Sequence, residues 1–384
     1  MISTAVIPSS LDELLAASGE TARTLAGAEQ SAWNGRVIES TGPVLGLAHW
    51  DGTLYLDSEA ILDPLRHLYE HPGQQHPTSA LVQYRESLAT LLHEHAHFLG
   101  PSGSTQDAAR EAFVKPGSRQ LEEGVTEAWA QDHLDDYVHR LGVDKVAPGI
   151  ESVQAGGYYA AFVPAVRKLT SDLDSRNDLS RGEVIDLLNR ETAAGQFPML
   201  VTLVYNSTRL PDLEPDGADT RSRLESILRA GLDHLDAYEL TAPGFAAAKS
   251  ISTADQLLDY LNQEIQSAES AYTFSPLHAD RAPTHANACA LPPPVPTPPP
   301  HEAALSGPTP SSPHEVALSG PTPSSPHEAA LSGPTPSSPH EVALSGLAPP
   351  SATRSQSAHL HPARGRPVAA LTSHVHERRR ERYG

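Results

Sequence analysis

The nine residues Leu91-Leu92-His93-Glu94-His95-Ala96-His97-Phe98-Leu99 carry the pattern HExxH within a run of apolar residues. Projected at about 100° per residue, the apolar side chains of this stretch gather on one side of a helix. His93 and His97 then lie one turn apart on the other side, where both imidazoles can reach one metal ion. The pattern predicts a metal-binding helix, with Glu94 placed to accept a proton from a water held by the metal.

His95 also falls within the motif, but it projects to the apolar side of the same helix. We therefore expect it to be a hydrogen-bonded histidine of the core or of the layer behind the metal ligands, and not a ligand itself. Gly100-Pro101-Ser102-Gly103 is predicted to end the helix.

A second stretch, Leu121–Ala130, supplies carboxylates to go with the histidines. Glu123 and Glu127 lie on one helical stripe whose other members are apolar: Ala130, Leu134, Val138 and Leu141. A buried carboxylate needs a partner, and a zinc ion held by two imidazoles would be one, with its fourth position left for water. We expect Glu123 to be the third ligand and Glu127 to hydrogen-bond a ligand histidine. Glu122 projects about 100° away from Glu123 and is expected to face solvent.

HExxH at 93–97, followed after 25 residues by Glu123-Gly124-x-x-Glu127, resembles the gluzincin branch of the zincin metallopeptidases. That resemblance implies zinc bound by His93, His97 and Glu123, Glu94 as general base and Glu127 behind the ligands. It also implies a small sheet that backs the metal helix, with an edge strand that aligns an extended peptide. No third histidine of the metzincin kind follows His97, and no motif identifies the group that polarises the substrate carbonyl. Among nearby tyrosines and histidines, Tyr158 is the first candidate for that role.

The composition divides the chain into a globular body and a tail. Of the 35 prolines, 22 follow Phe274, and the acidic excess behind the net charge of −20 lies before it. We predict a peptidase domain over residues 1–274, a disordered linker over 275–365 and a basic segment over 366–384. An acidic body argues against nucleic acid or an anionic membrane as its partner.

The lone cysteine, Cys289, rules out a disulfide framework within the chain. The amino-terminal residues lack a basic stretch followed by a long apolar run, and no window approaches eighteen apolar residues. The expected location is the cytoplasm, with export by a route that reads other signals left open.

The predicted fold is α+β and mostly helical, with a small sheet lobe facing a helical lobe and the metal between them. Asp51-Gly52 is a hairpin signal between two short apolar runs. Strands are expected over 36–40, 44–50 and 53–57. Helices are expected over 11–33, after an N-cap serine at Ser9-Ser10, and over 58–70, 105–114, 157–172, 180–194, 197–206, 219–240 and 253–272.

The tail repeats a 13-residue unit that begins at His301, His314, His327 and His340. Such a sequence cannot bury a core and is expected to be an extended spacer, followed by a short basic helix that docks on an acidic partner. The main functional hypothesis is a zinc peptidase that acts on peptides or proteins, with a single host or competitor protein as one form of substrate. The alternative is an interaction protein with a structural zinc site and a tail that recruits partners.

Overall fold

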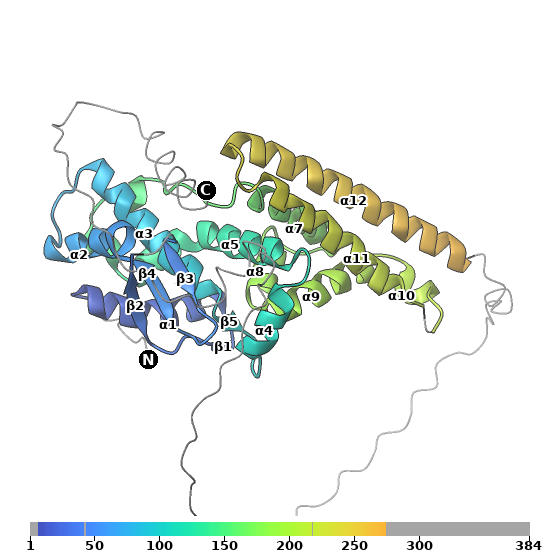
Figure 1. Cartoon of the computed structure of the whole chain (residues 1–384), viewed down its shortest axis with the longest axis horizontal. Coiled ribbons are helices and arrows are strands. Elements are labelled where there is room, and N and C mark those ends of the chain that lie inside the picture. Colours follow the sequence, from blue (N-terminus) through green and yellow to red (C-terminus); the bar gives the residue numbers. More distant parts are fainter. Residues whose placement is uncertain (1–6, 42–43, 217, 274–384) are drawn as a thin grey trace, which may run out of the picture. The chain divides into compact units, whose positions relative to one another are not determined.

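The computed structural model describes residues 7–41, 44–216 and 218–273 of the chain. The predicted linker and basic segment, with Cys289 and the repeats, lie outside this range. The described part is mostly helical with a small sheet (Figure 1). No helix in the described residues is long and apolar enough to cross a membrane.

Three short strands form the sheet, as the sequence predicted. They are β2 (Val37–Ser40), β3 (Gly46–Ala48) and β4 (Leu54–Asp57), in the order β2-β4-β3. β3 and β4 are antiparallel and are joined through the turn at Gly52, whose φ of 83° favours glycine. β2 runs parallel to β4. Strand β3 is therefore an edge strand, paired on one side only.

The first helix, α1 (Leu11–Ala26), begins where predicted but ends earlier than Trp33. Ser10 caps its start by accepting a hydrogen bond from the amide of Glu13. Gly27, with a φ of 66°, ends it in a left-handed conformation. Within the helix, Gly19 lies against the Trp33 ring, and a Cβ there would come within 2.4 Å of it. The glycine lets the chain after α1 fold back onto the helix.

The helix that carries the HExxH motif is α3 (Thr78–Ala96). Its apolar side is buried as predicted, and it ends with His97 in helical conformation, three residues before Gly100. The chain then forms a two-residue strand, β5 (Leu99–Gly100), antiparallel to β1 (Gln30–Ser31). The segment predicted as one helix over 58–70 is a π-helical turn (Ser58–Leu62) followed by α2 (Asp63–Glu70).

Helix α5 (Ser118–Arg140) passes between two apolar cores. Trp129, Tyr137 and Val138 pack in the first core, with α1, α2, α3 and β4. Leu121 and Val125 pack in the second core, with the later helices. Figure 1 shows α5 in the middle of the described part, with α3 and the sheet toward one end and α7, α11 and α12 toward the other.

The remaining helices follow the predicted order with shifted ends. α7 begins at Val163 and not near Gly157, while α12 begins at Pro243, ten residues before the predicted start. The bounds are α4 (Gln106–Phe113), α6 (Val143–Val146), α7 (Val163–Arg176), α8 (Glu183–Asn189), α9 (Ala193–Asn206), α10 (Leu210–Leu213), α11 (Thr220–Asp233) and α12 (Pro243–Thr273), with 3-10 turns at Ile150–Ser152 and His234–Tyr238.

Candidate metal centre

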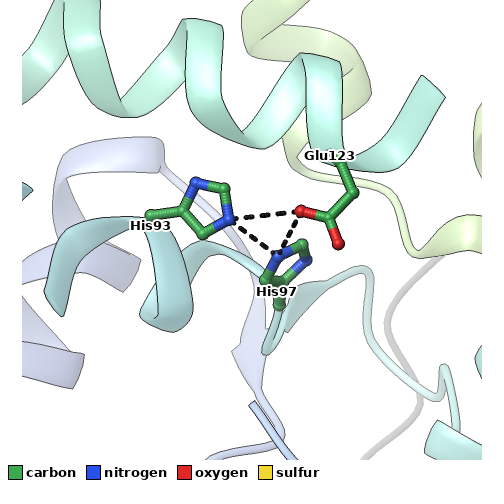
Figure 2. Close-up of side chains that lie close together, drawn as sticks. All are labelled: His93, His97 and Glu123. Carbon is green, nitrogen blue, oxygen red and sulfur yellow. Dashed lines mark hydrogen bonds and ion pairs between the residues drawn. The ribbon is translucent and has the colours of Figure 1, made fainter. Parts of the chain in front are cut away.

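Helices α3 and α5 bring His93, His97 and Glu123 together, as Figure 2 shows. The Nε2 atoms of the two histidines are 3.1 Å apart. Oε2 of Glu123 lies 3.4 Å from Nε2 of His93 and 3.6 Å from Nε2 of His97. Three ligands about 2.05 Å from a tetrahedral cation are about 3.3 Å from one another. The three separations match this geometry, so the group could hold a metal ion.

Glu127 lies behind His93 and fixes its orientation. Nδ1 of His93 is 2.9 Å from Oε2 of Glu127 and donates its hydrogen to that carboxylate. The other oxygen, Oε1, accepts from the amide of Tyr158 and from the side-chain nitrogen of Gln131, both at 2.8 Å. Because its Nδ1 carries the hydrogen, neutral His93 directs the Nε2 lone pair toward Glu123 and His97.

Glu122 does the same for His97, which corrects the expectation that it faces solvent. It is only 7% exposed, and its Oε1 lies 3.1 Å from Nδ1 of His97. Helix α5 is covered along more than one stripe because it runs between two cores, so a residue about 100° from the Glu123 stripe is also buried. The adjacent pair Glu122-Glu123, next to the apolar residues Leu121 and Val125, was the available sequence signal.

The convergence of three electron-rich atoms carries the main chemical implication. Each Nδ1 hydrogen is directed at a carboxylate, so the Nε2 lone pairs of His93 and His97 point at one another and at Glu123. Oε2 of Glu123 is buried without a hydrogen-bond partner. The lone pairs of these three atoms repel one another at separations of 3.1–3.6 Å unless a proton or a metal cation lies between them. The donor set therefore fits a divalent cation.

The pKa values of His93, His97 and Glu123 also indicate that a positive charge is stabilised at this site. Burial lowers the pKa of His93, but the neighbouring carboxylates of Glu123 and Glu127 outweigh this and raise it to about 9. Burial acts on His97 in the same way, and Glu122 and Glu123 raise its pKa well above the usual range. Burial raises the pKa of Glu123, whereas the two histidines hold it well below its usual range. Without a metal, protons take the place of the cation.

Glu94, the expected general base, points toward the sheet. It is 8% exposed, and its Oε2 accepts a hydrogen bond of 2.8 Å from the backbone amide of Ala48 in β3. Its Cγ, Cδ and Oε1 lie against Gly46 of the same strand. Burial raises the pKa of Glu94, an effect that the histidines and the Ala48 amide oppose. The sequence did not indicate which strand would meet this carboxylate.

The loop before α7 crosses the site with two consecutive tyrosines. Tyr158, the first candidate for polarising a substrate carbonyl, donates its backbone amide to Glu127, as described above. The ring of Tyr159 stacks on the imidazole of His93, with centroids 5.6 Å apart and planes 10° apart. Its φ of 53° is unusual for a bulky residue and marks local strain of a kind found near functional sites. Tyr159 is therefore the tyrosine whose ring lies against a ligand.

Arg119 is the cation one turn before Glu123 on α5. Burial lowers its pKa, but the hydrogen bonds and charge of Glu239, followed by the charge of Glu123, raise it above its usual range. Its Nη2 lies 2.6 Å from Glu239, and its guanidinium lies 5.3 Å from the centre of the Phe162 ring. This contact ties the segment before α12 to the start of α5, close to the site.

His95 lies on the opposite side of α3 from the metal group, as expected. It is fully buried, and its Nε2 is 2.6 Å from Oγ of Ser18. Since the Ser18 hydroxyl donates to the carbonyl of Leu15, it accepts from His95. Burial lowers the pKa of His95 to about 3. His95 is a neutral core histidine.

A second set of side chains also comes close enough to share a metal ion: His139, Asp144 and Glu151. His139 and Glu151 are exposed, and the Asp144 carboxylate is 3.6 Å from His139. This set lacks the buried, oriented histidines of the first group.

Comparison with known proteins found no match for this chain. No protein-family model, no curated protein and no solved structure matches it. The candidate metal centre therefore rests on the sequence motif and on the geometry of the side chains that surround it.

Proposed function

We propose that this chain is a zinc-dependent peptidase with a zincin-like arrangement of its site. The observation that carries the proposal is the convergence of His93, His97 and Glu123, each histidine being oriented by its own carboxylate. Two imidazoles and one carboxylate are a donor set that zinc favours, and three protein ligands leave a fourth position for water or substrate. The motif and the distances point to the same residues.

Zinc bound here would lower the pKa of a coordinated water to near 7 and polarise a substrate carbonyl. The remaining roles belong to side chains of the protein. Glu94 would accept a proton as the water attacks and return it to the leaving amine. Glu122 and Glu127 would hold the two imidazoles in place. Tyr159, from its position against His93, is the better placed of the two tyrosines to donate a hydrogen bond to the oxyanion, although Tyr158 stays a candidate.

The surroundings of Glu94 are consistent with an extended substrate. Strand β3 is at the edge of the sheet, and its free side lies next to Glu94. An extended peptide can add to such an edge through main-chain hydrogen bonds, here at backbone groups other than the Ala48 amide, which Glu94 already binds. A small sheet beside the metal helix, with helices on the other side of the site, also agrees with the zincin-like expectation. The substrate would be a peptide or protein, and a single-protein target is compatible with the same site.

The limited exposure of the site favours a second candidate function, that of an interaction protein with a structural metal. The side chains of His97 and Glu123 are 13% and 14% exposed. A closed zinc site stabilises folding without catalysis, and its removal unfolds the protein. In this alternative the tail would recruit the partners.

The deciding experiment uses the full chain. Its metal content is measured, and it is incubated with a whole-cell proteome whose new amino termini are then identified, so that a single-protein target would also be found. The matched variants are Glu94→Gln and the control Asp136→Asn, an exposed acidic residue on α5. The proposal expects one zinc per chain in all three proteins and cleavage in all but Glu94→Gln. Equal cleavage by Glu94→Gln would exclude Glu94 as base. Zinc binding without cleavage, together with unfolding on chelation, would favour the interaction protein.

A further inference from the structure

The free edge of strand β3 makes two contacts with the side chain of Glu94. In the β3–β4 ladder, the amide of His49 donates to Thr53 and the carbonyl of Leu45 accepts from Asp57. Hydrogen-bonded and non-hydrogen-bonded pairs alternate in antiparallel strands, so Gly46 and Ala48, opposite Leu56 and Leu54, turn their amides away from β4, whereas Leu47 faces it. The amide of Ala48 therefore faces the free edge, and its partner there is Oε2 of Glu94 at 2.8 Å.

The second contact requires a glycine. A Cβ built at Gly46 would lie 2.5 Å from Cγ, 2.6 Å from Oε1 and 2.8 Å from Cδ of Glu94. Real Cβ atoms do not approach other heavy atoms so closely, so any side chain at position 46 would displace the carboxylate. Glycine weakens a strand interior, and its presence there often marks a place where another group approaches the backbone.

We infer that Gly46 and the Ala48 amide position the carboxylate of Glu94 for its role as base. Gly46 is a positioning residue, since it provides the space, and the Ala48 amide sets the direction of the carboxylate by binding one oxygen. This inference rests on the proposed function for the role of Glu94. It adds that a sheet edge about 46 residues earlier in the chain, and not the metal helix alone, sets the geometry of proton transfer.

The direct test is Gly46→Ala, with Gly244→Ala as the matched control. A Cβ at Gly244 meets nothing within 4 Å, and its φ is not in the left-handed region, so the same chemical change is harmless there. Displacing a base by about 1 Å can cost about a hundredfold in rate. We expect Gly46→Ala to lower kcat about 10- to 100-fold with KM within about twofold and zinc content unchanged, since neither contact touches a metal ligand. The control should match the wild type.

Ala48→Pro tests the other contact without adding volume at position 46. Proline lacks the amide hydrogen, and its Cδ atom occupies the place of that hydrogen, so the Glu94 oxygen that lies 2.8 Å from the Ala48 nitrogen has to move away. We expect kcat to fall about tenfold with zinc retained, and the melting temperature to fall because a buried carboxylate loses a hydrogen bond. The double variant Gly46→Ala with Glu94→Asp should show a smaller fold-decrease in kcat than the product of the decreases in the two single variants. The shorter side chain of aspartate leaves room for the new methyl group at position 46.

Crystal structures of the metal-free proteins give a readout that does not depend on activity. The wild type should show a Glu94 oxygen within hydrogen-bond distance of the Ala48 nitrogen, and Gly46→Ala should show it displaced. A Gly46→Ala protein that keeps this hydrogen bond, or that keeps the kcat of Gly244→Ala, would overturn the inference. If the wild type cleaves nothing, the proposed function fails, and the base-positioning role of Gly46 and Ala48 fails with it. In that case the crystal structures still show whether Gly46 and the Ala48 amide position the Glu94 carboxylate. A missing peptidase activity can therefore be told apart from a wrong geometry.

Discussion

Replacing Glu122 is the sharpest test of how this site holds its histidines. The carboxylate is buried, bonds Nδ1 of His97 at 3.1 Å, and lies beside Glu123 without being a ligand itself. Glu122→Ala would leave the Nδ1 hydrogen of a buried imidazole without an acceptor. Glu122→Gln would keep an oxygen acceptor but remove its charge. The exposed Asp136 on the same helix provides the control Asp136→Asn.

The expected loss of zinc affinity follows from the strength of that hydrogen bond. Hydrogen bonds to charged groups contribute about 1.5–3 kcal/mol, and the strongest are about 2.7–2.9 Å long. At 3.1 Å the Glu122 bond belongs near the lower value. Since about 1.4 kcal/mol is tenfold in a dissociation constant, Glu122→Ala should weaken zinc binding about 10- to 30-fold. Glu122→Gln should weaken it about three- to tenfold, because a neutral acceptor is roughly half as strong.

The measurement is a competition titration of zinc against a chromophoric chelator, with the dissociation constant found for each full-length protein. The expected order of affinity is wild type, equal to Asp136→Asn, then Glu122→Gln and then Glu122→Ala. Circular dichroism of the metal-free proteins checks that the helices remain. Affinities of both Glu122 variants within twofold of the control would refute the claim that this carboxylate orients His97.

Three other outcomes are expected. The pKa of His93 in the metal-free fold, about 9, lies above its unfolded value near 6.5. Protonated His93 therefore contributes its full stabilisation below about pH 6.5, and this contribution is lost as the pH rises through 9. Between these pH values the melting temperature of the metal-free wild type should fall more than the melting temperature of the metal-free His93→Ala variant. His95→Ala should lower the free energy of unfolding by about 2–4 kcal/mol, measured by urea denaturation, while zinc affinity stays the same; a tenfold loss of affinity would contradict its core role. Tyr159→Phe should lower kcat about 10- to 100-fold and Tyr158→Phe should not, as measured by peptide hydrolysis, and the reverse result would return the oxyanion role to Tyr158.

Local periodicity was sufficient to identify the residues that converge. A helix places residues three or four apart on one face whatever surrounds it, so the spacing of His93 and His97, and of Glu123 and Glu127, could be read directly. The same rule separated His95 from the ligands, and the structure places its ring in the core. The hairpin at Gly52 and the mostly helical body were also predictable from turn chemistry and pattern.

Tertiary contacts decided what the local pattern could not. Glu122 was expected to face solvent because the sequence indicates a single apolar stripe as the inner face of the helix. Helix α5 lies between two cores and buries more than one stripe. The helix expected from Gly157 starts at Val163 because the preceding loop holds Tyr159 at positive φ against His93 and donates the Tyr158 amide to Glu127.

By itself the sequence determined which side chains share a helical face, since that depends only on the repeat of about 3.6 residues per turn. Only the folded chain decided which distant backbone meets each face. The contact of Gly46 and Ala48 with Glu94 joins segments 46 residues apart, and no local rule specifies it. The physical reason is that burial and hydrogen-bond partners are properties of the packed neighbours, and those are set by the whole fold.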